Sequence, residues 1–404
     1  MQRLRQLLTV ACAVTVALNM TQCTQAPPLE QCASDIASAI SPDTASALSP
    51  DTRISECTAV IESGDASNAD LATALMYRGM AYRRKGAPDS AIQDYDRAIR
   101  FQPDYAEAFL NRGAAYADRG EYDRAIQDYE QAMRFRPAFA VAFLNRGLAY
   151  RHKSDYERAI RDYKDAIRFR ADYAQAYGEL GAAYLDRGEH DRAIQELDHA
   201  LRLEPDYAVA FYNRAGAYYG KGEYDRAIQD YTQSIRFNGD FVPAFFNRSV
   251  SYQRKSEYER AIEDLDQVIR LEPDTKNAFN NRCWARAVLN TALEMALSDC
   301  NAALRLKPDS AEALDSRGFV YLRLAQYEKA IADCTASLDR NPKSASSLYV
   351  RGLAKWQHGD TRGGEADIAA AIALDTKITD TFARFPGMQQ LTRNVRTATD
   401  NTKP

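Results

Sequence analysis

The residue types that most often carry out catalysis are sparse in this sequence and share no common spacing. Its four histidines stand at positions that fit neither a metal site nor a catalytic group: His152, His190, His199 and His358. The sequence has no phosphate-binding glycine loop and no nucleophile-bearing turn. Acidic pairs such as Glu121 and Asp123 recur where helices are expected to start, and carboxylates there favour the positive end of the helix dipole. We therefore expect no enzyme activity, no cofactor and no metal ion.

Cysteine is the second reactive residue type, and its spacing fits no zinc signature. If the N-terminal segment described below is removed, five cysteines remain: Cys32, Cys57, Cys283, Cys300 and Cys334. In an oxidising compartment Cys32 and Cys57 are one candidate disulfide. Cys283 and Cys300 are the other, because they are expected on facing helices. Cys334 would then be free and buried.

Arginine and aspartate form the most regular chemical pattern. An arginine recurs mostly at a step of 34 residues: Arg78, Arg112, Arg146, Arg214, Arg248, Arg282, Arg317 and Arg351. Sixteen or seventeen residues later stands an acid: Asp94, Asp128, Asp162, Asp230, Asp264, Asp299, Asp333 and Asp367. At one step Leu180 replaces the arginine and Glu196 the aspartate, so both partners change together.

A guanidinium group can hold a carboxylate through two hydrogen bonds. We therefore predict structural ion pairs, either within a helical hairpin or across to its neighbour, typified by Arg112–Asp128, Arg146–Asp162 and Arg214–Asp230. The alternative is that these residues are solvated charges on helix surfaces, where an exposed pair contributes little to stability.

Composition excludes a strongly basic nucleic-acid-binding protein. The 404 residues include 52 basic and 56 acidic side chains, for a net charge of −4. Apolar residues make up 46% of the chain, enough for two or three ordinary globular cores. The 24 tyrosines recur at fixed spacing, which indicates an internal repeat.

The N-terminus has the features of an export signal. Arg3 and Arg5 precede an uncharged, largely apolar run at residues 7–18, which is shorter than the roughly 20 residues that span a bilayer. We predict a signal peptide over residues 1–26 and a periplasmic or secreted protein. Two alternatives are a retained membrane anchor and a lipid anchor at Cys23. Residues 27–52, rich in Pro, Ser, Ala and Asp, are expected to be a flexible tether.

A 34-residue repeat organises most of the remaining sequence. Glycine, tyrosine and alanine follow this step at Gly79, Gly113, Gly147 and Gly181, at Tyr82, Tyr116 and Tyr150, and at Ala91, Ala125 and Ala159. In each unit an amphipathic helix, a glycine-containing turn and a second amphipathic helix are expected, with a proline closing most units. Such a hairpin cannot bury its own apolar face, so the units must stack.

The repeat resembles the tetratricopeptide repeat family. The whole chain, with its N-terminal signal, resembles an exported bacterial member of that family. The second unit meets the family positions at Phe109, Gly113, Tyr116, Ala125, Tyr129, Ala132 and Pro137. The seventh unit departs, with Cys283 at the glycine position, Arg286 at the tyrosine position and one extra residue near 290–292. The resemblance implies an all-α, right-handed solenoid of about nine hairpins with terminal capping helices.

These patterns divide the chain into five segments. After the signal and the tether we expect an N-terminal capping helix at 53–71 and the repeat array at 72–376. Its units start near residues 72, 106, 140, 174, 208, 242, 276, 311 and 345. Residues 377–404 are expected to form a C-terminal capping helix and tail.

The resemblance places the ligand on the concave face, lined by the first helix of each unit. Equivalent first-helix positions carry Asn111, Asn145, Asn213, Asn247 and Asn281, and an amide can bond to the backbone of an extended peptide without reading its sequence. The alternative is that these asparagines bond to neighbouring helices. Flanking positions include Tyr212, Phe246, Trp284, Phe319, Arg151 and Arg254. The alternative for several of these residues is a place in the core between hairpins.

We therefore expect an exported scaffold or adaptor that binds a protein or extended peptide, with some acidic residues in that ligand. The alternative is an envelope lipoprotein that assists assembly of surface or secretion machinery. Nucleic acid and a membrane span in the mature chain are not expected.

Overall fold

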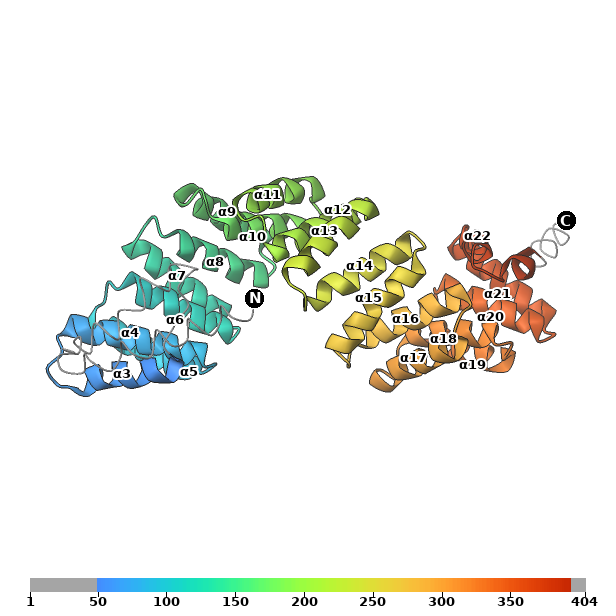
Figure 1. Cartoon of the computed structure of the whole chain (residues 1–404), viewed down its shortest axis with the longest axis horizontal. Coiled ribbons are helices and arrows are strands. Elements are labelled where there is room, and N and C mark those ends of the chain that lie inside the picture. Colours follow the sequence, from blue (N-terminus) through green and yellow to red (C-terminus); the bar gives the residue numbers. More distant parts are fainter. Residues whose placement is uncertain (1–48, 394–404) are drawn as a thin grey trace, which may run out of the picture. The chain divides into compact units, whose positions relative to one another are not determined.

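The computed structural model describes residues 49–393, and within that range the protein consists of helices joined by short turns, without a strand (Figure 1). The all-α solenoid fold predicted from the repeat is confirmed. The helices are α3 (Pro50–Glu62), α4 (Asn68–Arg84), α5 (Pro88–Phe101), α6 (Ala106–Asp118), α7 (Tyr122–Phe135), α8 (Ala140–His152), α9 (Tyr156–Phe169), α10 (Ala174–Asp186), α11 (His190–Leu203), α12 (Ala208–Gly220), α13 (Tyr224–Phe237), α14 (Val242–Arg254), α15 (Tyr258–Leu271), α16 (Lys276–Leu289), α17 (Leu293–Leu306), α18 (Ala311–Arg323), α19 (Tyr327–Arg340), α20 (Ala345–Gln357), α21 (Thr361–Leu374) and α22 (Ile378–Ala383).

The described residues separate into two compact units, which divide between residues 183 and 184. We number the hairpins in chain order, from α4–α5 as the first to α20–α21 as the ninth. The unit boundary falls inside α10, in the fourth hairpin. No helix between residues 49 and 393 combines the length and apolar character needed to cross a bilayer.

Within a hairpin, a small residue on the first helix lets a large ring of the second helix come close. In the second hairpin a Cβ added to Gly113 would lie 2.7 Å from Cε1 of Tyr129 and 3.1 Å from the carbonyl oxygen of Ala125. Tyr129 is 2% exposed. Between the helices Gly120 adopts a φ of 75°, a conformation that glycine reaches without strain. The turn and the close approach therefore both depend on glycine.

Within each unit the hairpins form two layers. First helices of successive hairpins contact each other directly: α4 with α6 and α6 with α8 in the first unit, and α12 with α14, α16 with α18 and α18 with α20 in the second. Each second helix also packs on the first helix of the next hairpin, as α5 does on α6 and α13 on α14. In each unit the first helices thus lie on the same side of their hairpins, and we call that side the inner face of the unit.

The N-terminal cap starts earlier than the sequence indicated. Helix α3 begins at Pro50, inside the segment expected to be a tether, because the Ser49 hydroxyl accepts a hydrogen bond from the Thr52 amide and proline suits the first turn of a helix. Cys57 and Val60 pack against Ala74 of α4. The predicted signal peptide, Cys23 and most of the tether lie outside the described residues.

The C-terminal segment forms a short helix and a turn instead of one long capping helix. Helix α22 ends at Ala383, before Pro386 and Gly387, and Gly387 has a φ of 74°. Phe382 and Phe385 then pack against residues of the first helices.

These contacts change the predicted groove. The ring centroid of Phe382 lies 5.4 Å from that of Phe319 and 6.3 Å from that of Trp284. Phe319, which the sequence placed in an open groove, is therefore buried beneath residues 382–385, whereas Trp284 contacts the same residues but stays partly exposed and lines a cavity. Arg323 Nη1 donates to the Pro386 carbonyl oxygen at 2.6 Å, and burial lowers the pKa of this guanidinium to about 10.

The seventh hairpin accommodates its extra residue in the turn. Asn290 and Ala292 both have positive φ, 56° and 49°, between α16 and α17. A disulfide joins Cys283 to Cys300 across the two helices, with Cα atoms 5.5 Å apart. Cys334 is free and buried in the next hairpin. Of the other candidate pair, Cys32 lies outside the described residues.

Candidate functional site

Each predicted arginine–aspartate pair is placed between the two helices of one hairpin. Arg112 donates from Nε and Nη2 to the two carboxylate oxygens of Asp128 at 2.8 and 2.7 Å. Arg146 holds Asp162 at the same distances, and Arg214 holds Asp230 at 2.7 and 2.8 Å. The same two-bond geometry occurs for Arg78–Asp94, Arg248–Asp264, Arg282–Asp299, Arg317–Asp333 and Arg351–Asp367.

The third guanidinium nitrogen reaches the preceding hairpin. Arg112 Nη1 donates to Asp96 at 2.6 Å, and Arg214 and Arg282 reach Asp198 and Asp266 at 2.6 Å. Each of these arginines therefore ties together three helices of two hairpins. The sequence left open whether the pairs lie within or between hairpins, and the structure shows that one side chain does both. The bond to the preceding hairpin could have been predicted from an acid that stands sixteen residues before each of these three arginines.

Burial disfavours the charged forms of the arginine and aspartate side chains in these pairs. Asp128 is 5% exposed, and burial raises the pKa of its carboxyl although Arg112 opposes the rise. For the Arg112 guanidinium, burial acts to lower the pKa, but Asp128 and Asp96 outweigh it and raise the pKa overall. Since a buried carboxylate needs its partner, these pairs are structural and are not available to a ligand.

The asparagine row lies on the inner face, but its members differ in what they already bind. Asn111 donates from Nδ2 to the Glu107 carbonyl oxygen at 2.9 Å, and Asn247 donates to the Tyr212 hydroxyl at 3.0 Å. Within residues 49–393, Asn145, Asn213 and Asn281 make no side-chain hydrogen bond, and all three are partly exposed. Only these three have both amide groups open to a ligand.

The two arginines predicted to flank the groove are both engaged. Arg151 pairs with Glu179 at 3.2 Å in the first unit. In the second unit Arg254 donates from Nε to the Tyr219 hydroxyl at 3.0 Å. Their positive charge remains on the inner face, but their geometry is fixed by these neighbours.

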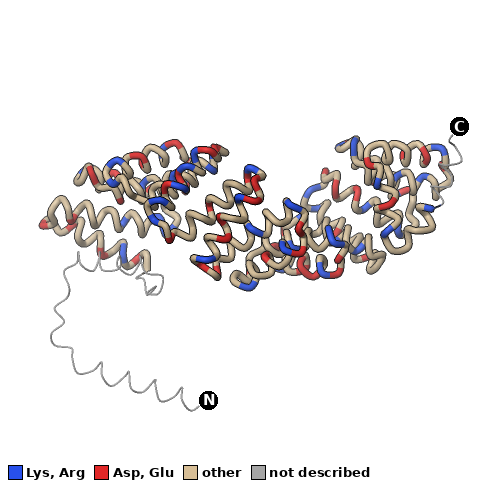
Figure 2. The backbone as a smooth tube through the Cα atoms, turned by 90° about the horizontal axis from the view of Figure 1, so that it is seen from above, with Lys and Arg blue, Asp and Glu red and all other residues tan. Residues whose placement is uncertain are grey.

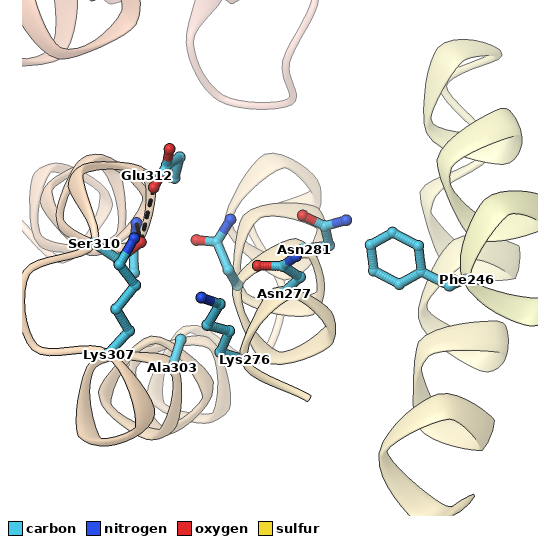
Figure 3. A pocket seen from close by; sticks show the side chains of 10 residues that line it. Phe246, Lys276, Asn277, Asn281, Ala303, Lys307, Ser310 and Glu312 are labelled. Carbon is cyan, nitrogen blue, oxygen red and sulfur yellow. Dashed lines mark hydrogen bonds between the residues drawn. The ribbon is translucent and has the colours of Figure 1, made fainter. Parts of the chain in front are cut away.

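One inner-face cavity holds a basic and amide-rich set of side chains. It has a volume of about 370 Å³ and is lined by Phe246, Lys276, Asn277, Asn280, Asn281, Ala303, Lys307, Ser310, Glu312 and Ala313. Figure 3 shows Phe246 on one side, Asn277 and Asn281 in the middle, and Lys307, Ser310 and Glu312 opposite. We call this cavity the lysine pocket.

The lysine pocket has spare hydrogen-bonding capacity and excess positive charge. Hydrogen bonds from its own backbone amide and from Ser310 lower the pKa of the Glu312 carboxyl, and the charges of Lys307 and Lys276 add to this effect. Lys276 and Lys307 form no salt bridge with any residue from 49 to 393, and the Oδ1 atom of Asn280 is buried without a hydrogen-bond donor in that range. Glu312 accepts a hydrogen bond from the Ser310 hydroxyl at 2.9 Å. The pocket can therefore hold an acidic group. The sequence prediction named Phe246 and Asn281 here but missed both lysines, because they stand at helix ends, outside the repeat positions considered.

A second cavity of about 320 Å³ shares Asn280, Asn281 and Glu312 with the lysine pocket and extends to Asp315, Ser337 and Ser344. Burial raises the pKa of Asp315 to about 6, although a hydrogen bond from the Ser347 hydroxyl at 2.9 Å acts to lower it. In the first unit a cavity of about 310 Å³ is lined by Met80, Arg83, Arg84, Asn111 and Asp118. All of these cavities open on first helices.

The rest of the described surface carries mixed charge. Figure 2 shows basic and acidic residues interspersed along the helices of each unit. Between residues 49 and 393 no group of three or more His, Cys, Asp or Glu side chains is arranged to hold a metal ion.

Comparison with known proteins identifies the repeat. The family profile described as TPR repeat matches residues 79–118, 115–154, 147–188 and 183–222, and profiles described as tetratricopeptide repeat match 208–241, 242–275 and 311–344. Together these matches cover more than half of the chain. No curated protein matches it.

Solved structures match parts of the chain. It is similar to MamA, with 29% identity over 42% of this chain and 93% of that one and a TM-score of 0.37. A tetratricopeptide repeat protein from Parabacteroides merdae is 19% identical over 62% of this chain and 98% of that one, with a TM-score of 0.47. YrrB, described as a TPR protein with an unusual peptide-binding site, is 23% identical over 46% and 95%, with a TM-score of 0.37.

Proposed function

This chain belongs to the tetratricopeptide repeat family and is a protein-interaction scaffold, and from that premise we propose that it binds an extended, partly acidic polypeptide along its inner face. The observation that carries the proposal is the lysine pocket. Two lysines without salt-bridge partners in residues 49–393 stand there beside three asparagines, and one of these, Asn281, belongs to the repeated row.

The chemistry of these groups favours a peptide over a small molecule. The open amide side chains of Asn145, Asn213 and Asn281 recur in every second hairpin, and each can pair with a backbone group of an extended chain. The lysines add a preference for carboxylates through charge-assisted hydrogen bonds. The protein would recognise such a ligand mainly through the ligand's backbone and charge.

Peptide arrays test this proposal. The full chain should bind acidic peptides more tightly than basic ones, and Lys276→Ser with Lys307→Ser should remove that preference. Asn213→Ala with Asn281→Ala should weaken the binding of all peptides alike, by about 0.5–1.5 kcal/mol of binding free energy for each hydrogen bond lost. Asn111→Ala is the matched control, because its Nδ2 is already bonded to Glu107 and it should change binding less. Unchanged binding by both double variants would refute the proposal.

We also propose that the protein works outside the cytoplasm. The basic residues and apolar run in residues 1–26 support this, since together they resemble a cleavable signal. Residues 1–26 fused to a reporter that is active only after export should give activity, and Arg3→Glu with Arg5→Glu should reduce it. An inactive wild-type fusion would place the protein inside the cell.

A further inference from the structure

We propose that the inner face of the fifth and sixth hairpins contains a recognition pocket for one aromatic side chain of the bound polypeptide. This proposal rests on the function proposed above and names a residue type that the ligand must carry. The cavity has a volume of about 270 Å³ and is lined by Leu185, Tyr212, Gly216, Tyr219, Tyr231, Asn247 and Val250. We call it the tyrosine pocket.

The pocket exists because one repeat position has lost its side chain. Gly216 occupies the first-helix position that carries a larger residue in every other hairpin: Met80, Ala114, Leu148, Ala182, Val250, Trp284, Phe319 and Leu353. A Cβ added to Gly216 would meet only the Cδ2 atom of Leu185 within 4 Å, at 3.3 Å. The space beyond that Cβ is therefore open, whereas a leucine side chain would fill it.

The walls carry three tyrosine rings and the apolar side chains of Leu185 and Val250. Tyr231 is 2% exposed, and its ring centroid lies 5.8 Å from that of Tyr212. The hydroxyl of Tyr212 accepts a hydrogen bond from Asn247, and that of Tyr219 accepts one from Arg254. These two hydroxyl groups are thus held by the protein, and their rings are left to contact a guest.

Size and charge select an aromatic guest. A cavity of about 150 Å³ can hold a benzene ring, so the tyrosine pocket has room for a phenyl or indole group. Aromatic pairs gain more than their buried area alone provides. A lysine or arginine guest is disfavoured, because the Arg254 guanidinium already lies at the Tyr219 hydroxyl at 3.0 Å.

The chain itself shows this type of contact elsewhere in the second unit. At the positions equivalent to Gly216 in the seventh and eighth hairpins, Trp284 and Phe319 receive Phe382 and Phe385 of the C-terminal segment. A short helix and turn that carry aromatic side chains thus pack on this repeat position in cis. At Gly216 the equivalent position is hollow, and the aromatic ring of a partner would supply the missing side chain.

Binding of synthetic peptides to the full chain tests the proposal. The peptides share acidic flanks and differ at one central residue, which is Phe, Trp, Ala or Lys. The wild-type chain should bind the Phe and Trp peptides about tenfold more tightly than the Ala peptide, the amount expected from burying one ring, and the Lys peptide no more tightly than the Ala peptide. Gly216→Leu should abolish this preference, and Gly216→Ala should reduce it.

Two controls isolate the pocket. Gly239→Leu makes the same substitution where an added Cβ meets nothing within 4 Å, and it should keep the preference. A peptide with benzoylphenylalanine at the central position should crosslink the wild-type chain within residues 212–250, a result that does not depend on any variant folding. A crosslink elsewhere, or a preference that survives in a folded Gly216→Leu protein, overturns the pocket.

The outcomes separate this proposal from the function on which it rests. If the wild-type chain binds the Phe and Ala peptides equally and Asn213→Ala with Asn281→Ala weakens both, the inner face binds peptides and the tyrosine pocket is refuted. If no peptide binds, both proposals are refuted.

Discussion

The second and seventh hairpins share one backbone plan but join their two helices by different chemistry. In the second, the Tyr129 ring packs against Gly113, and Asp128 holds the single arginine Arg112. In the seventh, a disulfide between Cys283 and Cys300 occupies the positions of that glycine and ring.

A second difference lies at the repeat tyrosine position. Arg286 occupies it in the seventh hairpin and shares Asp299 with Arg282. The repeat therefore requires a close helix approach and a compensated charge, and it tolerates several ways of providing them.

The largest difference between these hairpins is expected on removal of the central aspartate. Asp299→Ala leaves Arg282 and Arg286 without their shared carboxylate, and Arg286 is only 9% exposed. Breaking a buried pair costs about 3–5 kcal/mol, and this variant should reach the upper end of that range. Asp128→Ala should cost less, because it removes the carboxylate from one arginine instead of two; Arg112 and Arg282 both keep an acid of the preceding hairpin, Asp96 and Asp266, at 2.6 Å. Thermal unfolding followed by circular dichroism would measure both.

Asp123→Ala is the control for these variants, because Asp123 pairs with Lys153 on the surface and its side chain is 81% exposed. An exposed pair contributes at most about 1 kcal/mol. If all three variants unfold at the same temperature, the arginine–aspartate pairs do not stabilise the array.

Reduction of the disulfide should destabilise the seventh hairpin and leave the second unchanged. The bond closes a loop with a sequence separation of 17, and closing a loop of about 15 residues is expected to stabilise by about 3 kcal/mol. Hydrogen exchange should therefore accelerate in α16 and α17 after reduction, but not in α6 and α7. Cys283→Ala with Cys300→Ala should reproduce the effect and lose sensitivity to reductant. Equal acceleration in both hairpins would contradict this local role.

A methyl group at the glycine position tests the packing in the second hairpin. Gly113→Ala places Cβ 2.7 Å from Tyr129 and 3.1 Å from the Ala125 carbonyl oxygen, so the helices must separate or the ring must move. Overpacking of this kind costs about 1–3 kcal/mol. Gly239→Ala, where the added Cβ meets nothing within 4 Å, should leave the melting temperature nearly unchanged. Similar melting temperatures for the two variants would show that the close approach adapts freely.

The smallest expected effect is a pH dependence next to the seventh hairpin. Asp315 of α18 stands at the repeat position of Leu110, and burial raises its pKa from 3.8 to about 6. The folded protein therefore holds this proton more tightly than the unfolded chain does, and stability should fall as pH rises from about 4 to about 6. Asp315→Asn should flatten the melting temperature in that window. An identical pH profile in the variant would exclude Asp315 as its source.

The repeat made most of the fold predictable, because a step of 34 residues places glycine, tyrosine and proline where hairpins need them. Departures from the step were informative as well: Cys283, Arg286 and the extra residue near 290 all lie where the structure differs from the regular pattern. The start of α3 was misplaced, because Ser49 and Pro50 belong to residue types common both in tethers and in the first turn of a helix.

The sequence by itself determined the hairpins, their number of about nine and the recurrence of an arginine with an aspartate sixteen or seventeen residues later, since these follow from local periodicity. Only the tertiary structure decided which inner-face groups are open. It showed that Phe382 and Phe385 bury Phe319, that Asn111 and Asn247 are already bonded, and that the missing side chain of Gly216 leaves a cavity. The reason is physical, because stacking of the hairpins decides which neighbours cover a side chain. The spacing of residues in the sequence specifies neither how closely those neighbours approach nor how much space remains between them.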